Sequence, residues 1–206
     1  NLIEKKQFDT IYHEHYSYLS LIAVENIFTK NGLQIFDVEE LPTHGGSLRV
    51  YAQRKDTGTR KIEKKVRKMI DYEIKYGIKN SDTYLNYKVK VNKVKNDLQA
   101  FLNSVIENNE KIIAYGAAAK GNTLLNYMNI KNEIIKYVVD SNKYKQGKFL
   151  PGSGIKVVDQ EIIKEIKPNY ILILPWNLKD EIISSLTYVR EWDCKFVIAI
   201  PTLQII

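Results

Sequence analysis

The strongest constraint on the fold is an alternation of apolar runs and amphipathic stretches over residues 110–206. Four runs rich in Ile and Val alternate with three stretches of helical spacing. In chain order the apolar runs are KIIAYGA, IKYVVDS, NYILILPW and KFVIAIP, and the helical stretches are AKGNTLLNYM, VVDQEIIKEIK and LKDEIISSLTYVREW. Strands that are apolar on both faces and alternate with helices are typical of a parallel sheet covered on both sides. We therefore predict an α/β fold with a Rossmann-like C-terminal domain over residues 110–206.

The preceding residues predict a different organisation. Residues 16–30 carry apolar side chains at helical spacing, and Gly32 follows where a helix C-cap favours glycine. Two short β-like runs, LQIFDVEEL and SLRVYAQ, are then joined by PTHGGS, whose glycines suit a loop. We predict a helix and an antiparallel hairpin within residues 1–54.

Residues 55–109 form a predicted helical connector. Its apolar positions step by three and four residues, which indicates one helix with one buried stripe. The alternation KVKV at residues 88–91 is too short to outweigh that stripe. The stripe comprises Tyr84, Tyr87, Val91, Val94, Leu98, Phe101 and Val105.

Composition excludes several classes of protein. A chain of 206 residues that is 44% hydrophobic can bury a core, which excludes a disordered chain. The single cysteine, Cys194, excludes an internal disulfide and a cysteine-based zinc cluster, so we expect a reducing compartment, the cytoplasm. No apolar run reaches the roughly 18 residues of a membrane span, and we expect a soluble protein without membrane contact.

The net charge of +7 suits either nucleic acid or an anionic small molecule. The basic connector lacks helix-turn-helix, zinc-finger and ribonucleoprotein signatures. We therefore expect no nucleic-acid partner and interpret its charge as a solvated helix face.

Histidines are concentrated near the start of the chain, in Tyr12-His13-Glu14-His15-Tyr16. A carboxylate beside an imidazole can fix its tautomer and raise its basicity, so Glu14 and His15 form a candidate acid/base unit. A zinc site is disfavoured because few other ligands accompany the H-x-H spacing, and we predict no metal. The alternative is a polar loop that caps the following helix.

A second candidate site is the small-residue turn over residues 115–123, with Gly116, Lys120 and Asn122. Such a turn lets the backbone approach a phosphate at a helix N-terminus. Ala118 stands where the dinucleotide fingerprint has its middle glycine, and Asp140 stands where such folds hold a ribose hydroxyl. The alternative is a turn that needs small residues for packing.

Three further residues are candidates for binding. Trp176 and Asn177 follow a predicted strand at the edge where α/β sheets bind ligands, although for Trp176 we favour the alternative that it packs in the core. Arg49, in the predicted hairpin, could bind a phosphate or a carboxylate.

Five motifs together resemble the C-terminal half of the S-adenosylmethionine-dependent sugar C-methyltransferases. They occur in the family's order over nearly the whole chain: FDTIYHEHYSYLSL, HGGSLRVY, IIAYGAAAKGNTLLNY, VVDSNKYKQGKFLPGS and ILILPWNLKDEI. Members of this family act on nucleotide-linked 4-keto-deoxysugars in the synthesis of branched sugars. The resemblance implies a nucleotide-diphosphate sugar as substrate and S-adenosylmethionine as methyl donor.

The resemblance also implies how the functions are distributed among domains. Family members have an N-terminal zinc-binding segment, a class I methyltransferase domain that holds the donor, and a C-terminal Rossmann-like domain. Residues 1–54 resemble only the tail of the central domain, so the chain is expected to be a fragment without the donor site. Its partners would be the N-terminal and donor-binding domains, and the fragment alone is expected to be inactive.

The family's Y-x-E-H signature corresponds to Tyr12, Glu14 and His15. The resemblance implies that His15 is the base, with Tyr12 and Glu14 holding the sugar and the imidazole. It also suggests that the Lys120 turn and the Trp176–Asn177 edge hold the sugar nucleotide. The alternative is a Rossmann-like module that binds a nucleotide or nucleotide sugar without chemistry. An NAD-dependent oxidoreductase would need a better glycine fingerprint.

Overall fold

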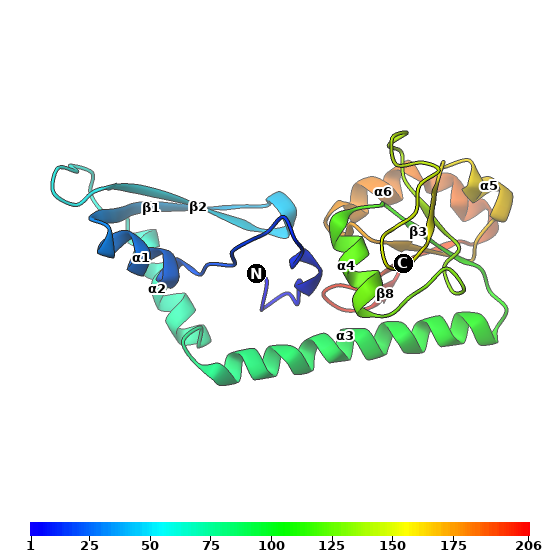
Figure 1. Ribbon diagram of the computed structural model, residues 1–206, viewed down its shortest axis with the longest axis horizontal. Helices are drawn as coiled ribbons and strands as arrows, with labels where there is room; N and C mark the ends of the chain where they lie inside the picture. Colours follow the sequence, from blue (N-terminus) through cyan, green and yellow to red (C-terminus); the bar gives the residue numbers. More distant parts are fainter. The chain divides into compact units, whose positions relative to one another are not determined.

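A computed structural model describes all 206 residues, and their contacts divide the chain into two compact units, whose elements are labelled in Figure 1. The first unit contains Asn1 and His15–Lys88, and the second contains Leu2–Glu14 and Val89–Ile206. The connector expected over residues 55–109 is therefore shared between the units. The N-terminal segment, defined here as Leu2–Glu14, belongs to the second unit.

The first unit is a long hairpin with two helices beside it (Figure 1). Strands β1 (Leu33–Leu41) and β2 (Ser47–Arg54) pair antiparallel, which confirms the predicted hairpin. The helices are α1 (Leu21–Lys30) and α2 (Lys64–Tyr76), and both contact β1. Their core is formed by Leu21, Ile22, Ile35, Val38, Val66 and Ile70.

Helix α1 begins later than expected, because residues 16–20 are irregular. The hydroxyl of Ser20 caps the helix, and the carboxylate of Glu73 on α2 accepts hydrogen bonds from the amides of Leu21 and Ile22 at 2.8 and 2.9 Å. The first amides of a helix have no partner inside it. A carboxylate there satisfies two of them and complements the helix dipole.

One continuous helix, α3 (Ser81–Glu107), confirms the predicted stripe and includes the KVKV sequence. Its N-terminal part belongs to the first unit and its remainder to the second. Tyr84, at the start of the predicted stripe, is exposed, whereas the stripe is buried farther along the helix. The buried side chains are Val91, Val94, Leu98, Phe101, Leu102 and Val105.

The second unit is built on a six-stranded, mostly parallel sheet, which confirms the predicted parallel sheet and adds two strands, β5 and β8, to the four predicted runs. The strands lie in the order β5-β4-β3-β6-β7-β8, which is 3-2-1-4-5-6 in chain order and is the order of Rossmann folds. The first five are parallel and β8 is antiparallel. Their bounds are β3 (Ile112–Tyr115), β4 (Tyr137–Val139), β5 (Lys156–Val158), β6 (Tyr170–Ile173), β7 (Lys195–Ile198) and β8 (Gln204–Ile205).

Helical segments cover the two faces of this sheet. The alternate strand residues Ile113, Ile171 and Phe196 form a core with the helices on one face. On the other face, Phe101 of α3 meets Tyr170 edge-on at 5.0 Å between ring centroids. The helical segments are α4 (Ala119–Tyr127), α5 (Ile162–Ile166), α6 (Lys179–Ser185) and the 3-10 segment η4 (Thr187–Trp192).

One prediction for this unit is wrong in part. The stretch VVDQEIIKEIK was expected to be helical throughout, but its first two residues belong to β5, and α5 starts only at Ile162. A strand of only three residues acquires its conformation from pairing with β4 rather than from its own sequence. None of the helices combines the length and apolar character that crossing a membrane requires.

Candidate functional site

The strand order identifies one edge of the sheet as the place for a ligand. Neighbouring strands β3 and β6 are the point where the order reverses, and in open α/β sheets ligands bind outside the carboxyl ends of the strands at that point. The chain leaves β3 through the turn at Gly116 and enters α4. It leaves β6 through Pro175 and enters the 3-10 segment η3 (Trp176–Leu178). The predicted residues Gly116, Lys120, Trp176 and Asn177 all lie in these two connections.

The turn at Gly116 is shaped by packing. Gly116 has φ +90°, and a Cβ there would lie 2.6 Å from Cγ of Pro175. Its amide donates to the carbonyl of Val139 at 2.7 Å, and the amide of Ala118 donates back to the carbonyl of Gly116 at 2.8 Å. These amides are used within the protein, which favours the packing alternative for Gly116 over a phosphate cradle.

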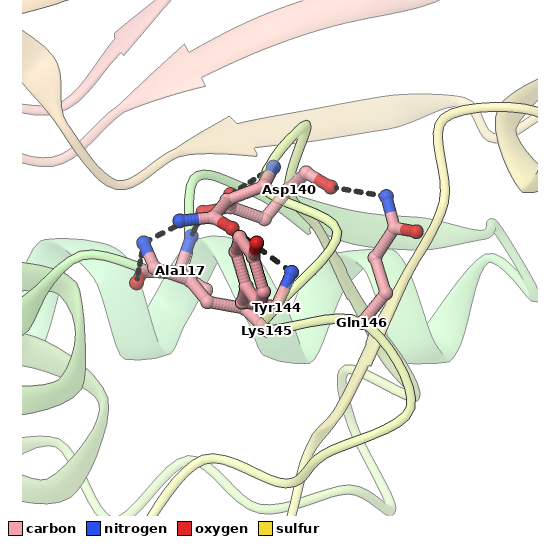
Figure 2. Close-up of polar contacts among 6 residues, drawn as sticks. Ala117, Asp140, Tyr144, Lys145 and Gln146 are labelled. Carbon is pink, nitrogen blue, oxygen red and sulfur yellow. Dashed lines mark hydrogen bonds and ion pairs between the residues drawn. The ribbon is translucent and has the colours of Figure 1, made fainter.

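Asp140 closes the same turn from the end of β4 (Figure 2). Its Oδ2 accepts hydrogen bonds from the amide of Ala117 at 2.8 Å and from Nζ of Lys145 at 3.2 Å, and its Oδ1 accepts from the amide of Asn142 at 2.8 Å. Lys145 also donates to the carbonyl of Ala117 at 2.9 Å. Both carboxylate oxygens therefore hold the loop, which gives Asp140 a structural role in this turn.

Lys120, Trp176 and Asn177 meet at the switch point. Nζ of Lys120 donates to Oδ1 of Asn177 at 2.6 Å and lies 4.5 Å from the ring centroid of Trp176. An ammonium group can only donate, so the amide oxygen of Asn177 faces it and the amide NH2 points elsewhere. Lys120 is 8% exposed and Asn177 is exposed, so Asn177 is the member open to solvent.

Asp9 completes this group, and sequence reasoning missed it. It lies in the 3-10 segment η1 (Phe8–Thr10), which packs against α4. The indole Nε1 of Trp176 donates to Oδ2 of Asp9 at 2.7 Å, across 167 residues of sequence. Asp9 is 0% exposed, which is rare for a carboxylate without a full ion pair. We call Asp9, Lys120, Trp176 and Asn177 the switch-point cluster.

The electrostatics of the switch-point cluster follow from its burial. Desolvation raises the pKa of Asp9 from 3.8 to about 6, against the opposing effects of the Trp176 hydrogen bond and the Lys120 charge. Oδ1 of Asp9 is buried without a hydrogen-bond partner of good geometry, although nearby backbone amides favour the charged form. Desolvation likewise lowers the pKa of Lys120, while the Asp9 charge raises it. Burial therefore disfavours the charged forms of both Asp9 and Lys120, and each of these two opposite charges stabilises the other.

The histidine-rich segment lies at the boundary between the units, where Tyr12 and Glu14 end the second unit and His15 begins the first. Tyr12 and His15 are half-buried and Glu14 is exposed. The carboxylate of Glu14 lies 3.8 Å from Nε2 of His13, which is the neighbouring imidazole that the sequence prediction did not pair with it. The imidazole of His15 lies edge-on to Tyr18, with 6.3 Å between ring centroids.

Two other candidate residues have structural partners. Arg49 is exposed on the hairpin and donates to Oε2 of Glu39 on the facing strand at 3.0 Å, which supports the carboxylate alternative. Asn122 accepts hydrogen bonds from Asn126 through its carbonyl and side-chain oxygens at 2.8 and 3.2 Å. The same Asn126 donates to the carbonyl of Pro151 at 3.0 Å and thereby attaches α4 to the loop before β5. Asn122 contributes by holding the side chain of Asn126.

No group of three or more His, Cys, Asp or Glu side chains could hold a metal ion. The histidines at positions 13 and 15 therefore have no third ligand of these types beside them.

Two comparisons relate this chain to known proteins. Residues 42–201 match the family described as the C-methyltransferase C-terminal domain. The chain is also similar to the C-methyltransferase NovU of Streptomyces niveus, with 32% identity over 205 residues. That match covers 100% of this chain and 49% of NovU, so the chain spans about half the length of this relative.

Proposed function

Because this chain belongs to the C-methyltransferase family, whose C-terminal domain it contains, we propose that it forms the substrate-binding half of an enzyme that methylates carbon. The observation that carries this proposal is the 32% identity to a C-methyltransferase along the whole chain. We propose a nucleotide-linked 4-keto-deoxysugar as the substrate. Its ketone makes a neighbouring C–H acidic, and its diphosphate suits a chain with a net charge of +7.

The proposed chemistry of this chain is removal of a proton from the carbon next to the ketone. His15 is the proposed base, since an imidazole can take up a proton near neutral pH. Tyr12 and Glu14 hold the sugar and orient the imidazole. Loss of the proton leaves an enolate, whose carbon is the nucleophile that becomes methylated.

The proposed binding edge for the sugar nucleotide is the switch point between β3 and β6. Asn177 is exposed, and its amide NH2 offers a hydrogen bond to a phosphate oxygen. The Lys120 ammonium, which donates to Oδ1 of Asn177, fixes the orientation of this amide and adds positive charge. The ring of Trp176 stabilises the Lys120 ammonium by a cation–π contact. Lys120 itself is too buried to be the first contact with a ligand.

S-adenosylmethionine, the proposed methyl donor, is not assigned to any residue of this chain. The only sheet of the first unit is the two-stranded hairpin of β1 and β2. The turn after β3 in the second unit is closed by Asp140 and Lys145. We propose that the donor binds to the part of the enzyme that corresponds to the half of NovU not covered by this chain.

A second candidate function is a Rossmann-like module that binds a nucleotide sugar without chemistry. It is favoured by one observation, namely that the switch-point cluster lies wholly within the second unit. A binding module has no need for the Tyr12-Glu14-His15 sequence, whereas carbon methylation needs a base. Proton exchange therefore separates the two functions.

The test is deuterium exchange in the methyltransferase that contains this chain, incubated in D2O with a dTDP-linked 4-keto-deoxysugar and no methyl donor. Enolisation exchanges the C–H next to the ketone without any methylation. We expect exchange by the natural protein and a loss of roughly 10²-fold or more in His15→Asn. His44→Asn, an exposed imidazole of the hairpin loop, is the matched control and should exchange normally. Equal exchange in His15→Asn would refute the role of His15, and no exchange above buffer in the natural protein would refute the proposed reaction.

A further inference from the structure

Asp9 is a buried carboxylate to which neither the family resemblance nor the proposed reaction assigns a role. It is 0% exposed, and Oδ1 lacks a well-formed hydrogen bond. Burying a charged group without full compensation costs free energy, so a fold that needed only a packed surface would place an apolar residue there. The partner of this carboxylate is the indole of Trp176, at the edge where the substrate is proposed to bind.

The surroundings of Asp9 connect it to the rest of the N-terminal segment. Phe8 lies against Tyr127 of α4 with 5.0 Å between ring centroids. Thr10 is buried and its hydroxyl donates to the carbonyl of Gln7 at 2.7 Å. Side chains of η1 thus fix the backbone on α4 immediately before Tyr12. Tyr12 lies three positions after Asp9, so their Cα atoms lie within roughly 11 Å of each other.

We propose that Asp9 is a positioning residue, which binds the indole of Trp176 and thereby fixes the segment that carries Tyr12 and Glu14 at the switch point of the second unit. This inference rests on the proposed function, because it explains how residues from distant parts of the sequence serve one substrate. The same contact orders the binding edge. The indole that Asp9 holds is the one over which Lys120 lies, and Lys120 orients the amide of Asn177.

The contacts of Asp9 include one group of opposite charge, Lys120. On α4 the charged group that acts on Asp9 is Lys120, and η3 contributes the neutral indole of Trp176. Ionised Asp9 attracts both groups, whereas neutral Asp9 keeps only the hydrogen bond with the indole. Oδ2 accepts from the indole, so the open Oδ1 is the oxygen that takes the proton.

The first test uses this chain alone and observes the indole N–H resonances of Trp176 and Trp192 by 15N–1H NMR between pH 4 and 8. Trp192 donates to the carbonyl of Pro168 and is the internal reference. We expect the Trp176 resonance to titrate with a midpoint near pH 6 and to lose this titration in Asp9→Asn, which keeps the size and an acceptor oxygen. A Trp176 resonance that titrates identically in Asp9→Asn would overturn the contact.

The second test measures methyl transfer by the enzyme that contains this chain. We expect Asp9→Ala to lower kcat at least tenfold, with the KM for the methyl donor changed less than threefold. Asp9→Asn should recover part of that loss. Trp176→Phe keeps the ring beneath Lys120 and removes only the donor, so it should resemble Asp9→Ala even if Asp9→Ala folds poorly. Unchanged kcat in both Asp9→Ala and Trp176→Phe would overturn the positioning role.

The two proposals fail in different ways. If the natural enzyme shows no proton exchange with a keto-sugar nucleotide, the proposed function fails while the indole titration still decides whether Asp9 holds Trp176. If exchange and methylation occur normally in Asp9→Ala, the positioning role fails while the proposed function stands.

Discussion

Replacing Asp9 by Asn should make the second unit less sensitive to pH. Burial raises the pKa of Asp9 from 3.8 to about 6, so the folded protein prefers the protonated carboxyl. At about 1.4 kcal/mol for each pH unit, that rise corresponds to roughly 3 kcal/mol of unfolding free energy. The contribution is fully present below about pH 4 and is lost as the pH rises through 6. Asn carries no charge at any of these pH values and should show no such loss.

The assay is urea unfolding of this chain at half-unit steps from pH 4 to 8, followed by tryptophan fluorescence. Both tryptophans, Trp176 and Trp192, lie in the second unit, so the signal reports on that unit. At each pH, the unfolding free energy of the natural protein is subtracted from that of Asp9→Asn. This difference removes the contribution of all other titrating groups. The difference in unfolding free energy should grow by roughly 3 kcal/mol between pH 4 and pH 7 in favour of Asn.

Asp193→Asn is the matched control. Asp193 is exposed and has φ +58°, a backbone conformation that Asp and Asn both tolerate, so its substitution should change stability by less than about 0.5 kcal/mol at every pH. A difference between Asp9→Asn and the natural protein that stays constant from pH 4 to 8 would refute the reasoning. It would mean that the Asp9 carboxyl is as well solvated in the folded chain as in the unfolded one.

Two further predictions concern the folding of each unit. Glu73→Ala leaves two amides of α1 without their acceptor and should lower the stability of the first unit by about 1–2 kcal/mol, measured by far-ultraviolet circular dichroism. Asp71→Ala, which removes an exposed i,i+4 pair, should cost less than about 0.5 kcal/mol, and equal losses in the two variants would contradict the capping role. Gly116→Ala should destabilise the second unit by about 2 kcal/mol or more in urea unfolding, because it combines a positive φ with a collision at Pro175. Gly147→Ala has φ +79° but open space, and should therefore cost clearly less; similar losses would show that the collision is relieved.

The sequence predicted the parts of the fold that depend on local pattern. Strands β3, β4, β6 and β7 coincide with Ile- and Val-rich runs, and α3 follows a regular stripe, because burial imposes that periodicity. Strand β5 was missed because Lys156–Val158 is short and owes its conformation to pairing with β4. The start of α1 was placed too early because the apolar residues at 18 and 19 continue a helical pattern that Ser20 ends.

The candidate site was predictable to a similar extent. Lys120 follows β3, and Trp176 and Asn177 follow β6. Because the carboxyl ends of neighbouring parallel strands lie together, the pairing of these two strands is enough to place the three residues at one edge of the sheet. Asp9 could not be placed in this way, because its burial arises from the packing of η1 against α4 and from its contact with η3, 167 residues away. The roles of Gly116 and Asp140 likewise depended on contacts with Pro175 and Lys145 that no spacing encodes.

The most direct test of the central claim is calorimetric titration of this chain with dTDP, GDP and S-adenosylmethionine in parallel. The account predicts binding of a nucleoside diphosphate without binding of S-adenosylmethionine. It further predicts at least tenfold weaker binding of the diphosphate in Asn177→Leu, and an unchanged affinity in Lys143→Met, an exposed lysine of the loop after β4. Binding of S-adenosylmethionine, or no binding of either diphosphate, would contradict the claim that this chain is the substrate-binding half of a sugar C-methyltransferase.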